Sequence, residues 1–433
     1  MVKMSKQTLR KNLLIIYFMS ILTFLSFNLN GTALFLQPGE SKENPIIISS
    51  KTDFESFKDE INSGNDFKGQ YIKLSNDINL NSNEKIKGSI INWESAGYCI
   101  FNGDKKISKD SKAFQGYFDG NGYTINCNIN LEKNNAKGLS LFGYVGENAK
   151  IENLNVSGYI KSTANNKILA GICDLNYGTL ENCNVKAKEI YNKYGVCGIC
   201  NANYGTIKNC EFKGKLTSKD LICCGICGIN YKDIENCKTF ALLNNCTDKG
   251  IKGNNEFKMP ETAGITSYNY GKISECYVNA YILNSNVDIS NGIDYYRKRV
   301  YNQPTLHDGC AGGIVSRNNG LVEKCNFKGY INGYQIGGIC AANYETLDNC
   351  STDCTLSGLI IGGISAQNIV GDKKISSPYV AKLPGGYIKD CKTSGEINTL
   401  YLAGDIVCLD FWNDSHSTIL DCSSSSKINY LKN

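Results

Sequence analysis

A repeated sequence unit is the feature that most limits how this chain of 433 residues can fold. One half of the unit is an apolar residue, two spacers and usually Cys, as in LENCNV from Leu180 and IKNCEF from Ile207. The other half lies upstream and combines Gly-Ile with an Asn, as in GICDLNYG from Gly171 and GICNANYG from Gly198. A unit this short cannot bury its apolar edge alone, so successive units must stack on one another.

Each unit has the pattern of short strands separated by turns that are rich in Asn and Gly. Within one strand, Cys210 and Phe212 have the same parity and therefore face the same side of an extended chain. Stacked units can hydrogen-bond to one another at the usual strand spacing of about 4.8 Å. The sequence therefore predicts an all-β fold, a parallel β-helix (solenoid) of about ten coils.

The cysteines recur at two fixed positions of the unit, which predicts that they pack inside the coils. Two CxxC pairs, Cys197 with Cys200 and Cys224 with Cys227, resemble a zinc ribbon or a redox pair in isolation. Other coils carry residues such as Thr266 at an equivalent position, where a zinc ligand could not be replaced. No βαβ pattern surrounds the pairs, as a thioredoxin-like site requires. We therefore predict cysteines that behave as small hydrophobes, with no metal and no other cofactor.

The predicted interior ladder has two kinds of rung. Its cysteines are Cys173, Cys200, Cys227, Cys183, Cys210, Cys237, Cys276, Cys325, Cys350, Cys391 and Cys422. Its asparagines are Asn176, Asn203, Asn230, Asn269, Asn318 and Asn343, each just before a turn. Because Asn tolerates positive φ, we expect these asparagines to form a sharp corner of each coil. Disulfides between neighbouring cysteine rungs are an alternative, since adjacent strands bring Cα atoms within disulfide range.

Residues 1–33 have the composition of a signal peptide. Four basic residues between Lys3 and Lys11 precede an apolar run at 13–27 that is shorter than a typical membrane span. Small residues suggest cleavage after Ala33, and an uncleaved anchor is the alternative. Removing the segment lowers the formal net charge from +5 (46 minus 41) to +1 (42 minus 41). A nearly neutral chain is not expected to bind nucleic acid or an anionic membrane electrostatically.

Residues 34–113 are expected to form an N-terminal cap, and residues 114–433 the β-helix. The cap is expected to contain one short helix that begins near Asp53 and carries apolar residues at helical spacing. The segment QYIKLSNDINL at 70–80 reads as a strand and a turn. The segment FQGYFDGNGYTI at 114–125 contains two turn signals and leads into the first coil.

The segments YIKLSNDINL and FQGYFDGNGYTI, together with the repeated Gly-Ile and Asn-Cys units, resemble secreted bacterial proteins with GLUG-type repeats. The resemblance covers residues 44–430 and implies a right-handed parallel β-helix of the pectin-lyase-like class. It also implies an exported and often surface-associated protein, such as adhesin-like proteins and the non-catalytic part of IgA-specific metallopeptidases. This chain departs from the usual glycine- and valine-rich form by placing Cys at many inward positions, which leaves the redox state of the cysteines open.

The sequence carries few residues suited to catalysis. A metallopeptidase needs two histidines on one helix with a Glu, whereas His307 and His416 are far apart in the chain. A polysaccharide hydrolase or lyase needs paired or calcium-binding carboxylates, and no acidic ladder recurs at a fixed position. Asp390 and Asp421 align with each other, but another coil has Asn182 there, which is typical of a turn or of a position that faces solvent. We therefore expect a non-enzymatic protein, with a carbohydrate-active lyase or hydrolase as the alternative.

Two insertions in consecutive coils are the best candidates for binding. They occupy 244–262 and 284–311 and leave from the same corner of the coil, so they should lie side by side. The second contains a cluster of aromatic and basic residues: Tyr295, Tyr296, Arg297, Arg299, Tyr301 and His307. Rigid aromatic side chains interleaved with arginine are typical of binding surfaces. A solvated loop without a function is the alternative explanation.

Together these features predict an exported β-helix protein, secreted or at the extracellular cell surface, that presents loops for adhesion or ligand binding. The expected partner is a host or environmental glycan or protein, and no nucleic acid is expected. Contact with a membrane is expected only through the N-terminal segment, if that segment is not cleaved. A passive structural stalk is a further alternative.

Overall fold

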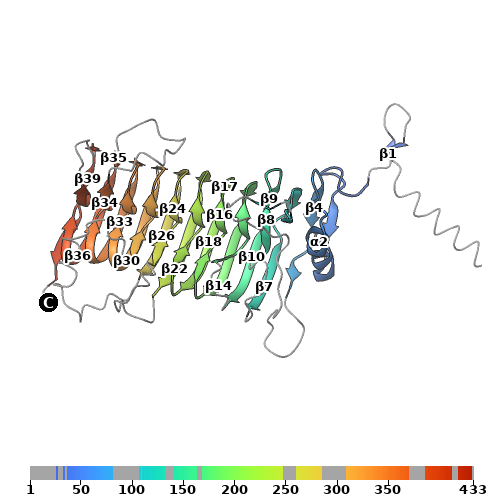
Figure 1. Cartoon of the computed structure of the whole chain (residues 1–433), viewed down its shortest axis with the longest axis horizontal. Coiled ribbons are helices and arrows are strands. Elements are labelled where there is room, and N and C mark those ends of the chain that lie inside the picture. The colour runs from blue at the N-terminus through green and yellow to red at the C-terminus, as the bar shows by residue number, and fades with distance from the viewer. Residues whose placement is uncertain are drawn as a thin grey trace, which may run out of the picture.

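The chain forms a long rod in which the strands of successive coils lie side by side (Figure 1). The computed structural model describes residues 26–27, 33–34, 37–80, 107–108, 110–131, 140–162, 168–246, 260–284, 309–369, 386–411 and 418–431. The described strands of the rod pair in parallel, from β3 (Ile46–Ile48) with β4 (Tyr71–Leu74) to β35 (Tyr387–Lys389) with β38 (Thr418–Leu420). The fold is a right-handed parallel β-helix, which confirms the predicted fold class.

One side of the rod is a sheet of twelve short strands, here named the twelve-stranded sheet. Its strands in order are β3, β4, β6 (Tyr117–Asp119), β9 (Lys150–Glu152), β13 (Thr179–Glu181), β17 (Thr206–Lys208), β21 (Asp233–Glu235), β25 (Lys272–Ser274), β29 (Leu321–Glu323), β32 (Thr346–Asp348), β35 and β38. Because β3 and β4 precede residue 114, the sheet begins within the segment that the sequence assigns to the cap.

A second side is the nine-stranded sheet. Its strands in order are β8 (Phe142–Val145), β12 (Cys173–Asn176), β16 (Cys200–Asn203), β20 (Cys227–Asn230), β24 (Thr266–Asn269), β28 (Val315–Asn318), β31 (Cys340–Asn343), β34 (Ser365–Ile369) and β37 (Val407–Phe411). The strands from β8 to β31 are each followed by a turn that leads into the twelve-stranded sheet.

The third side carries the longest strands and is named the wide sheet. It contains β5 (Ile78–Asn79), β7 (Thr124–Leu131), β10 (Asn155–Ser162), β14 (Asn184–Asn192), β18 (Glu211–Ser218), β22 (Lys238–Asn245), β26 (Tyr277–Asn284), β30 (Asn326–Gly337), β33 (Ser351–Gly362), β36 (Lys392–Gly404), β39 (Ser423–Ser424) and β40 (Lys427–Tyr430). Short corner strands follow it in the earlier coils: β11 (Ile168–Ala170), β15 (Gly195–Cys197), β19 (Ile222–Cys224), β23 (Glu261–Ala263) and β27 (Cys310–Gly312). In later coils the corner belongs to one long strand, since Gln335 of β30 pairs with Cys310 of β27.

One helix, α2 (Lys51–Ser63), closes the N-terminal end of the rod (Figure 1). The Ser50 side chain caps its start by accepting a hydrogen bond from a backbone N–H, and Gly64 ends it with a φ of 117°. The buried face of the helix consists of Phe54, Phe57 and Ile61. The Phe57 ring packs against the rings of Phe114 and Phe142, at centroid distances of 5.6 and 6.3 Å. The helix thus covers the apolar end of the first coils, as the sequence predicted.

The glycine of each Gly-Ile pair is required because neighbouring coils approach very closely there. A Cβ atom on Gly198 would lie 1.9 Å from the carbonyl oxygen of Gly225, and one on Gly225 would lie 2.0 Å from that of Gly264. The next residue, Ile199 in this coil, is fully buried in the core. In this half of the repeat, the glycine allows a backbone contact that leaves no room for a side chain. The isoleucine that follows it packs in the apolar core.

The asparagines of the repeat do not adopt the positive φ that we expected from the sequence. Asn176 and Asn203 end strands of the nine-stranded sheet and are fully buried. Positive φ occurs instead at the residue just before Leu154 and just before the cysteine at the equivalent position of each later coil. These residues are Asn153, Asn182, Asn209, Asn236, Glu275, Lys324, Asn349, Asp390 and Asp421. The sharp corner therefore lies between the twelve-stranded sheet and the wide sheet. The turn position predicted for the two aspartates is confirmed.

The predicted signal peptide, residues 1–33, lies almost entirely outside the described residues. The structure describes β1 (Ser26–Phe27) and β2 (Ala33–Leu34) there, which pair antiparallel. Of the helices that the structure describes, none is both long and apolar enough to cross a membrane.

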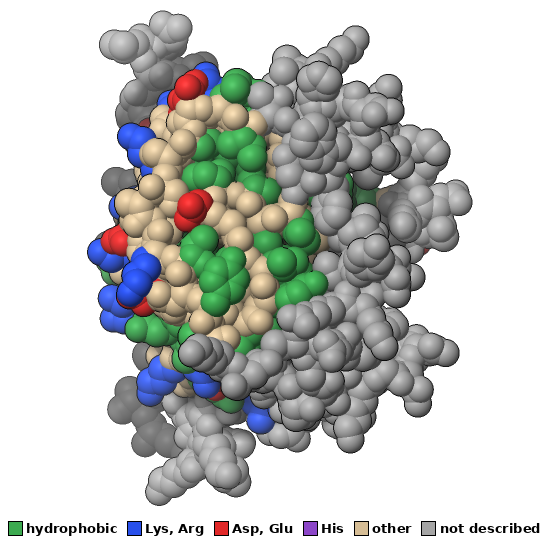
Figure 2. Space-filling view, turned by 90° about the vertical axis from the view of Figure 1, so that its left-hand side faces the viewer, with side chains coloured by type: hydrophobic (Ala, Val, Ile, Leu, Met, Phe, Trp, Pro, Cys, Tyr) green, Lys and Arg blue, Asp and Glu red, His purple; other side chains and the backbone are tan. Residues whose placement is uncertain are grey.

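The C-terminal end of the rod differs from the capped N-terminal end. Figure 2 views this end directly and shows hydrophobic side chains on its surface. Leu420 of β38 is 41% exposed and Tyr430 of β40 is 67% exposed. In the middle of the rod, the next coil covers apolar side chains of this kind. At the last described coil they are exposed.

Candidate functional site

The first cysteine file runs along the inner side of the nine-stranded sheet. Cys173, Cys200 and Cys227 pair directly across β12, β16 and β20 and are fully buried. The Sγ atoms of Cys173 and Cys200 lie 3.5 Å apart. Thr266 and Val315 continue the same file in the next coils. The file thus mixes thiol, hydroxyl and hydrocarbon side chains of similar size.

The second cysteine file lies at the corner that leads into the wide sheet. Its members are Cys183, Cys210, Cys237, Cys276, Cys325, Cys350, Cys391 and Cys422, and all but the half-buried Cys422 are buried. The thiols of Cys183 and Cys210 lie 3.3 Å from the carbonyl oxygens of Glu181 and Lys208 in their own coils. Each thiol is therefore surrounded by backbone and by its neighbours in the file.

Burial makes these thiols poorly suited to chemistry. Burial raises the pKa of Cys200 and of Cys227 well above the ordinary value of a thiol. In the second file, hydrogen bonds from neighbouring thiols oppose the effect of burial and lower the pKa of Cys276 and Cys350. Because the thiolate is the reactive form, the thiols whose pKa is raised are weak nucleophiles, and full burial keeps reagents away from the others. No cysteine in the described part of the chain forms a disulfide. Within that part, no group of three or more His, Cys, Asp or Glu side chains is placed to hold a metal ion.

The two CxxC pairs divide between different clusters. Cys200 and Cys227 belong to the main core of the rod. Cys197 and Cys224 belong to a small outer cluster at the corner strands, together with Ile222. The two cysteines of each CxxC pair therefore lie in separate clusters, although their spacing in the sequence resembles that of a zinc ribbon.

The asparagines form a hydrogen-bonded ladder. The Asn203 side-chain amide donates to the Oδ1 atom of Asn230 at 2.8 Å, and Asn230 donates to Asn269 at 2.9 Å. The same bond continues through Asn318 and Asn343 at 2.9 Å each. These amides also donate to backbone carbonyls of the following turn, as from Asn203 to Gly205 at 3.1 Å. The ladder satisfies buried polar groups at the turn of every coil.

The predicted binding residues Tyr295, Tyr296, Arg297, Arg299, Tyr301 and His307 lie outside the described residues. The ends of both insertions are described. Asn245, before the first insertion, pairs with Asn284, before the second. Glu261, after the first, pairs with Cys310, after the second. Both insertions therefore leave and rejoin the rod at one corner on neighbouring coils.

An aromatic patch, exposed at Tyr281 and half-buried elsewhere, lies on the wide sheet beside these insertions. It consists of Phe240 and Leu242 on β22, Tyr277 and Tyr281 on β26, and Tyr330 on β30, three neighbouring strands near the middle of the rod (Figure 1). Tyr281 is 63% exposed, and its ring lies 5.8 Å from that of Tyr330. The rings of Phe240 and Tyr277 are 5.9 Å apart. Apolar and aromatic side chains that group at the surface in this way are typical of interaction sites.

The patch lies on the two coils that carry the insertions and on the coil that follows them. One coil earlier, the positions that pair with Phe240 and Leu242 are Lys213 and Lys215. One coil later, the position that pairs with Tyr330 is Thr355. The carboxylate beside it, Asp353, is already paired with Lys328 at 3.5 Å. The patch therefore offers ring faces and phenol hydroxyls for binding.

A buried ion pair lies at the base of the insertions. Glu261 is the first residue of β23, is fully buried, and accepts hydrogen bonds from the Arg317 Nε and Nη2 atoms at 2.8 and 2.5 Å. The Ser316 hydroxyl donates to its other carboxylate oxygen. The Arg317 guanidinium also lies over the Tyr268 ring, 5.7 Å from its centroid. The pair therefore connects the two neighbouring coils that follow the insertions.

The electrostatics of Glu261 depend on Arg317. Burial raises the pKa of the Glu261 carboxyl above its ordinary value, while Arg317 and the Ser316 hydroxyl act in the opposite direction. A buried carboxylate without a partner is strongly unfavourable. Arg317 therefore fixes the corner from which both insertions extend, and it is a positioning residue.

Sequence reasoning found the corner of the insertions but missed the patch and the ion pair. The patch could have been found by aligning outward positions of the wide strands, where Phe240 and Tyr281 replace the lysines of earlier coils. The ion pair joins residues 56 positions apart in sequence. No local pattern indicates such a contact.

No family model matches the chain. A relative from Evansella cellulosilytica, described as a "Putative Gly-rich membrane protein", is 25% identical over 147 residues. The match spans 34% of this chain and about 15% of the length of that relative. A crystal structure described as a "putative immunoglobulin A1 protease" from Bacteroides ovatus aligns with 91% of this chain and 88% of that one, at 14% identity and a TM-score of 0.40. The resemblance to GLUG-type repeats stays a prediction from the sequence.

Proposed function

We propose that this protein is a non-enzymatic β-helix that acts outside the cytoplasm and binds a glycan or protein through the coils with insertions. The observation that carries the proposal is that the aromatic patch lies on those two coils and on the next one. Tyr281 and Tyr330 lie on paired strands of the sheet, whose backbone is held on both sides by neighbouring strands. Little backbone conformational entropy is therefore lost when these side chains bind a partner. Aromatic side chains of this kind often dominate binding energy.

Export to the cell surface or the medium is supported by the sequence. The basic and apolar N-terminal segment has the order of a signal peptide. The resemblance to secreted GLUG-repeat proteins fits the same location. The relative described as a membrane protein fits a location at the cell envelope. Adhesion to a host or environmental surface is the role that follows from such a location.

A polysaccharide lyase or hydrolase is the competing function. Glycoside hydrolases typically need two carboxyl groups that flank the bond to be cleaved and are accessible to the substrate. Here Glu261, the fully buried glutamate, is bonded to Arg317, and Asp353 at the edge of the patch is paired with Lys328. Both carboxylates are engaged in ion pairs. These contacts support the binding function over the catalytic one.

Binding assays with matched variants test this proposal. We would apply the intact protein to a glycan array and to immobilised extracellular-matrix proteins, and then repeat the measurement with a Tyr281→Ala, Tyr330→Ala double variant. Tyr430→Ala is the control, because Tyr430 is 67% exposed at the far end of the rod. A variant that lacks residues 285–308 tests the second insertion.

We expect at least a tenfold loss of affinity in the double variant and in the deletion, and no change in the control. Binding that is equal in all four proteins would contradict the proposed surface. The absence of any binding by the intact protein would favour the passive stalk. Release of unsaturated or reducing ends from a polysaccharide panel would establish an enzyme.

A further inference from the structure

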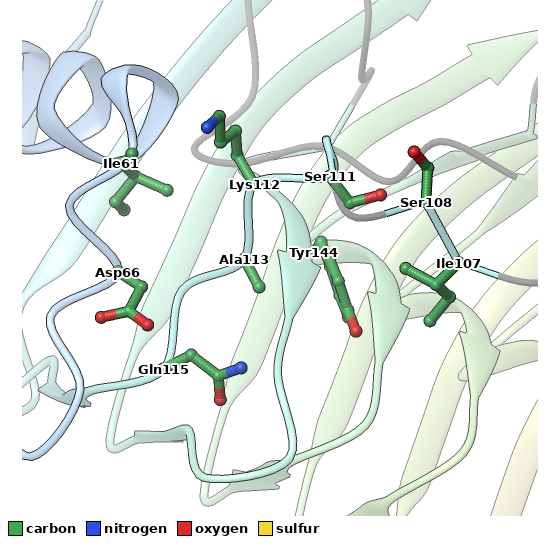
Figure 3. A pocket seen from close by; sticks show the side chains of 10 residues that line it. Ile61, Asp66, Ile107, Ser108, Ser111, Lys112, Ala113, Gln115 and Tyr144 are labelled. Atoms are coloured by element: carbon green, nitrogen blue, oxygen red, sulfur yellow. The ribbon is translucent and has the colours of Figure 1, made fainter.

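A polar cavity lies between the end of α2 and the first coils (Figure 3). It is separated along the rod from β22, β26 and β30, which carry the aromatic patch (Figure 1). Its volume is about 360 Å³. Its lining comes from separate parts of the chain: Ile61 in the last turn of α2, Gly64 and Asp66 after it, a group of residues before β6, and Tyr144 on β8. The group before β6 consists of Ile107, Ser108, Ser111, Lys112, Ala113 and Gln115. The volume lies at the lower end of the range for small-ligand sites.

Three polar side chains in the cavity have hydrogen-bonding capacity to spare. The Asp66 Oδ1 atom accepts from the Lys68 N–H at 3.0 Å, which leaves Oδ2 without a donor among the described residues. The Gln115 Oε1 atom accepts from the Asn148 N–H at 3.1 Å, which leaves the two Nε2 hydrogens unused there. Lys112 has no carboxylate partner in the described part of the chain. The cavity thus offers one strong acceptor and two donors.

The remaining lining is apolar or aromatic. Figure 3 shows the side chains of Ala113, Gln115 and Tyr144 pointing toward a common space, with Lys112 directed toward the end of α2. The half-buried Tyr144 ring contacts the Tyr177 ring at 5.8 Å in a T-shaped arrangement, which holds it in place. An aromatic wall beside hydrogen-bonding groups suits a ligand with both C–H faces and hydroxyls.

Backbone hydrogen bonds hold the lining segments together. The Gln115 N–H donates to the carbonyl oxygen of Asp66 at 2.7 Å, and the Phe114 N–H donates to that of Tyr144 at 2.9 Å. The C-cap at Gly64 fixes the direction in which the chain leaves the helix. The polar groups are therefore positioned before any ligand arrives, which favours binding.

We propose that this cavity binds a neutral polyol of the size of one hexose, as a free sugar or as the terminal residue of a glycan. The charges of Asp66 and Lys112 cancel, which argues against selection of an anion or a cation. Donors and acceptors on one rim and a ring on the other match alternating hydroxyls and C–H groups on a pyranose. The cavity is separate from the aromatic patch. Experiments can therefore contradict the proposal for one site without affecting the proposal for the other.

Titration of the intact protein with single sugars tests the proposal. Saturation-transfer NMR and calorimetry would use neutral hexoses, N-acetylhexosamines, a uronic acid and an amino sugar at millimolar concentrations. Ala113→Phe fills the cavity without removing a hydrogen-bonding group, and Asp66→Asn keeps the bond from Lys68 but removes the charge. Asp59→Asn is the matched control, because Asp59 lies on α2 outside the cavity lining. Circular dichroism establishes that each variant is folded.

We expect a neutral sugar to bind, a loss of at least tenfold in Ala113→Phe and a smaller loss in Asp66→Asn, with Asp59→Asn unchanged. An array that displays the same sugar at glycan ends separates a terminal residue from the free form, and binding in either form supports the proposal. Failure of every neutral sugar, binding of the charged sugars alone, or full binding by folded Ala113→Phe and Asp66→Asn would overturn it. Tyr281→Ala should bind the sugar normally whatever its effect at the patch.

Discussion

The position of Cys200 shows which side chains fit inside the rod. It lies between Cys173 and Cys227, and the same file continues with Thr266 and Val315. The position therefore accepts a small side chain that is apolar or can hydrogen-bond to a nearby carbonyl. The Thr266 hydroxyl does so by donating to the carbonyl oxygen of Gly228 at 3.1 Å.

Substitutions at Cys200 should depend on burial and size and not on sulfur chemistry. We expect Cys200→Val to change the free energy of unfolding by less than about 1.5 kcal/mol, since it approximately conserves volume. Cys200→Asp should cost more than about 4 kcal/mol, because it buries an unpaired carboxylate. Urea denaturation of both variants measures the difference. Equal, large losses in both would indicate a role for the thiol itself.

The asparagine ladder predicts a difference between its interior and its end. Asn230→Leu removes an acceptor for Asn203 and a donor for Asn269, so it should cost about 2–5 kcal/mol. Asn176 donates to Asn203 at 2.8 Å, but its own Oδ1 atom has no partner in the described chain. Asn176→Leu should therefore cost about half as much. Urea unfolding of the two variants checks this, and equal losses would contradict a cooperative ladder.

At the residue scale, the sequence predicted which side chains recur but not every reason for the recurrence. The repeat located the buried cysteines and asparagines because a fixed period places equivalent residues in register. It misassigned the positive φ, which belongs to residues such as Asn182 and Glu275. Since Asn is common at both positions, composition alone could not separate a side-chain ladder from a left-handed turn.

At the scale of the elements, the corner strands carry the most consequential contact. Glu261 of β23 and Arg317 of β28 fix neighbouring coils where the insertions rejoin the rod. Sequence spacing predicted the shared corner because both insertions interrupt the repeat at the same point. It could not predict the ion pair or the aromatic patch, because outward positions are free to vary from coil to coil.

The ion pair should show strong coupling. Arg317→Met leaves a buried carboxylate without its partner, so we expect a loss of about 3–5 kcal/mol. Glu261→Gln in the same chain removes the charge and should recover much of that loss. A double-mutant cycle by urea denaturation measures the coupling. Additive losses would show that the two side chains stabilise the rod independently.

The twelve-stranded sheet carries a file of charges that should respond to acid. Glu181 accepts from Lys150 and Lys208 at 2.7 and 2.9 Å. The hydrogen bond from Lys150 is the largest cause that lowers the pKa of Glu181 below its ordinary value of 4.5. A lowered folded pKa adds stability above the unfolded value and loses it as the pH falls through the folded value.

Glu181→Gln should therefore reduce the loss of stability as the pH falls below about 4.5. The effect should stay below about 1 kcal/mol, because water screens a pair this close to the surface. Urea midpoints measured from pH 7 to pH 3 test this. Glu152→Gln serves as a comparison, since that carboxylate contacts Lys150 alone at 2.5 Å. A steeper acid dependence in Glu181→Gln would contradict the assigned sign.

At the scale of the whole molecule, the rod is a stack in which each coil contacts its neighbours. Its fold could be predicted because the same repeat unit occurs in many coils. A single irregular coil therefore does not hide the pattern. The start of the sheet could not be predicted, because β3 and β4 do not carry the repeat. The cavity beneath α2 was also missed, since its lining comes from segments without a period.

The central claim is that the cysteines fill the interior of the coils as free thiols. Alkylation of the native protein, followed by denaturation, a second label and peptide mass spectrometry, tests this directly. The account predicts that Cys173, Cys183, Cys200, Cys210, Cys227 and Cys237 stay unlabelled in the native protein and take the second label after denaturation without reductant. Rapid labelling of these residues in the native state, or a need for reductant before they react, would contradict it.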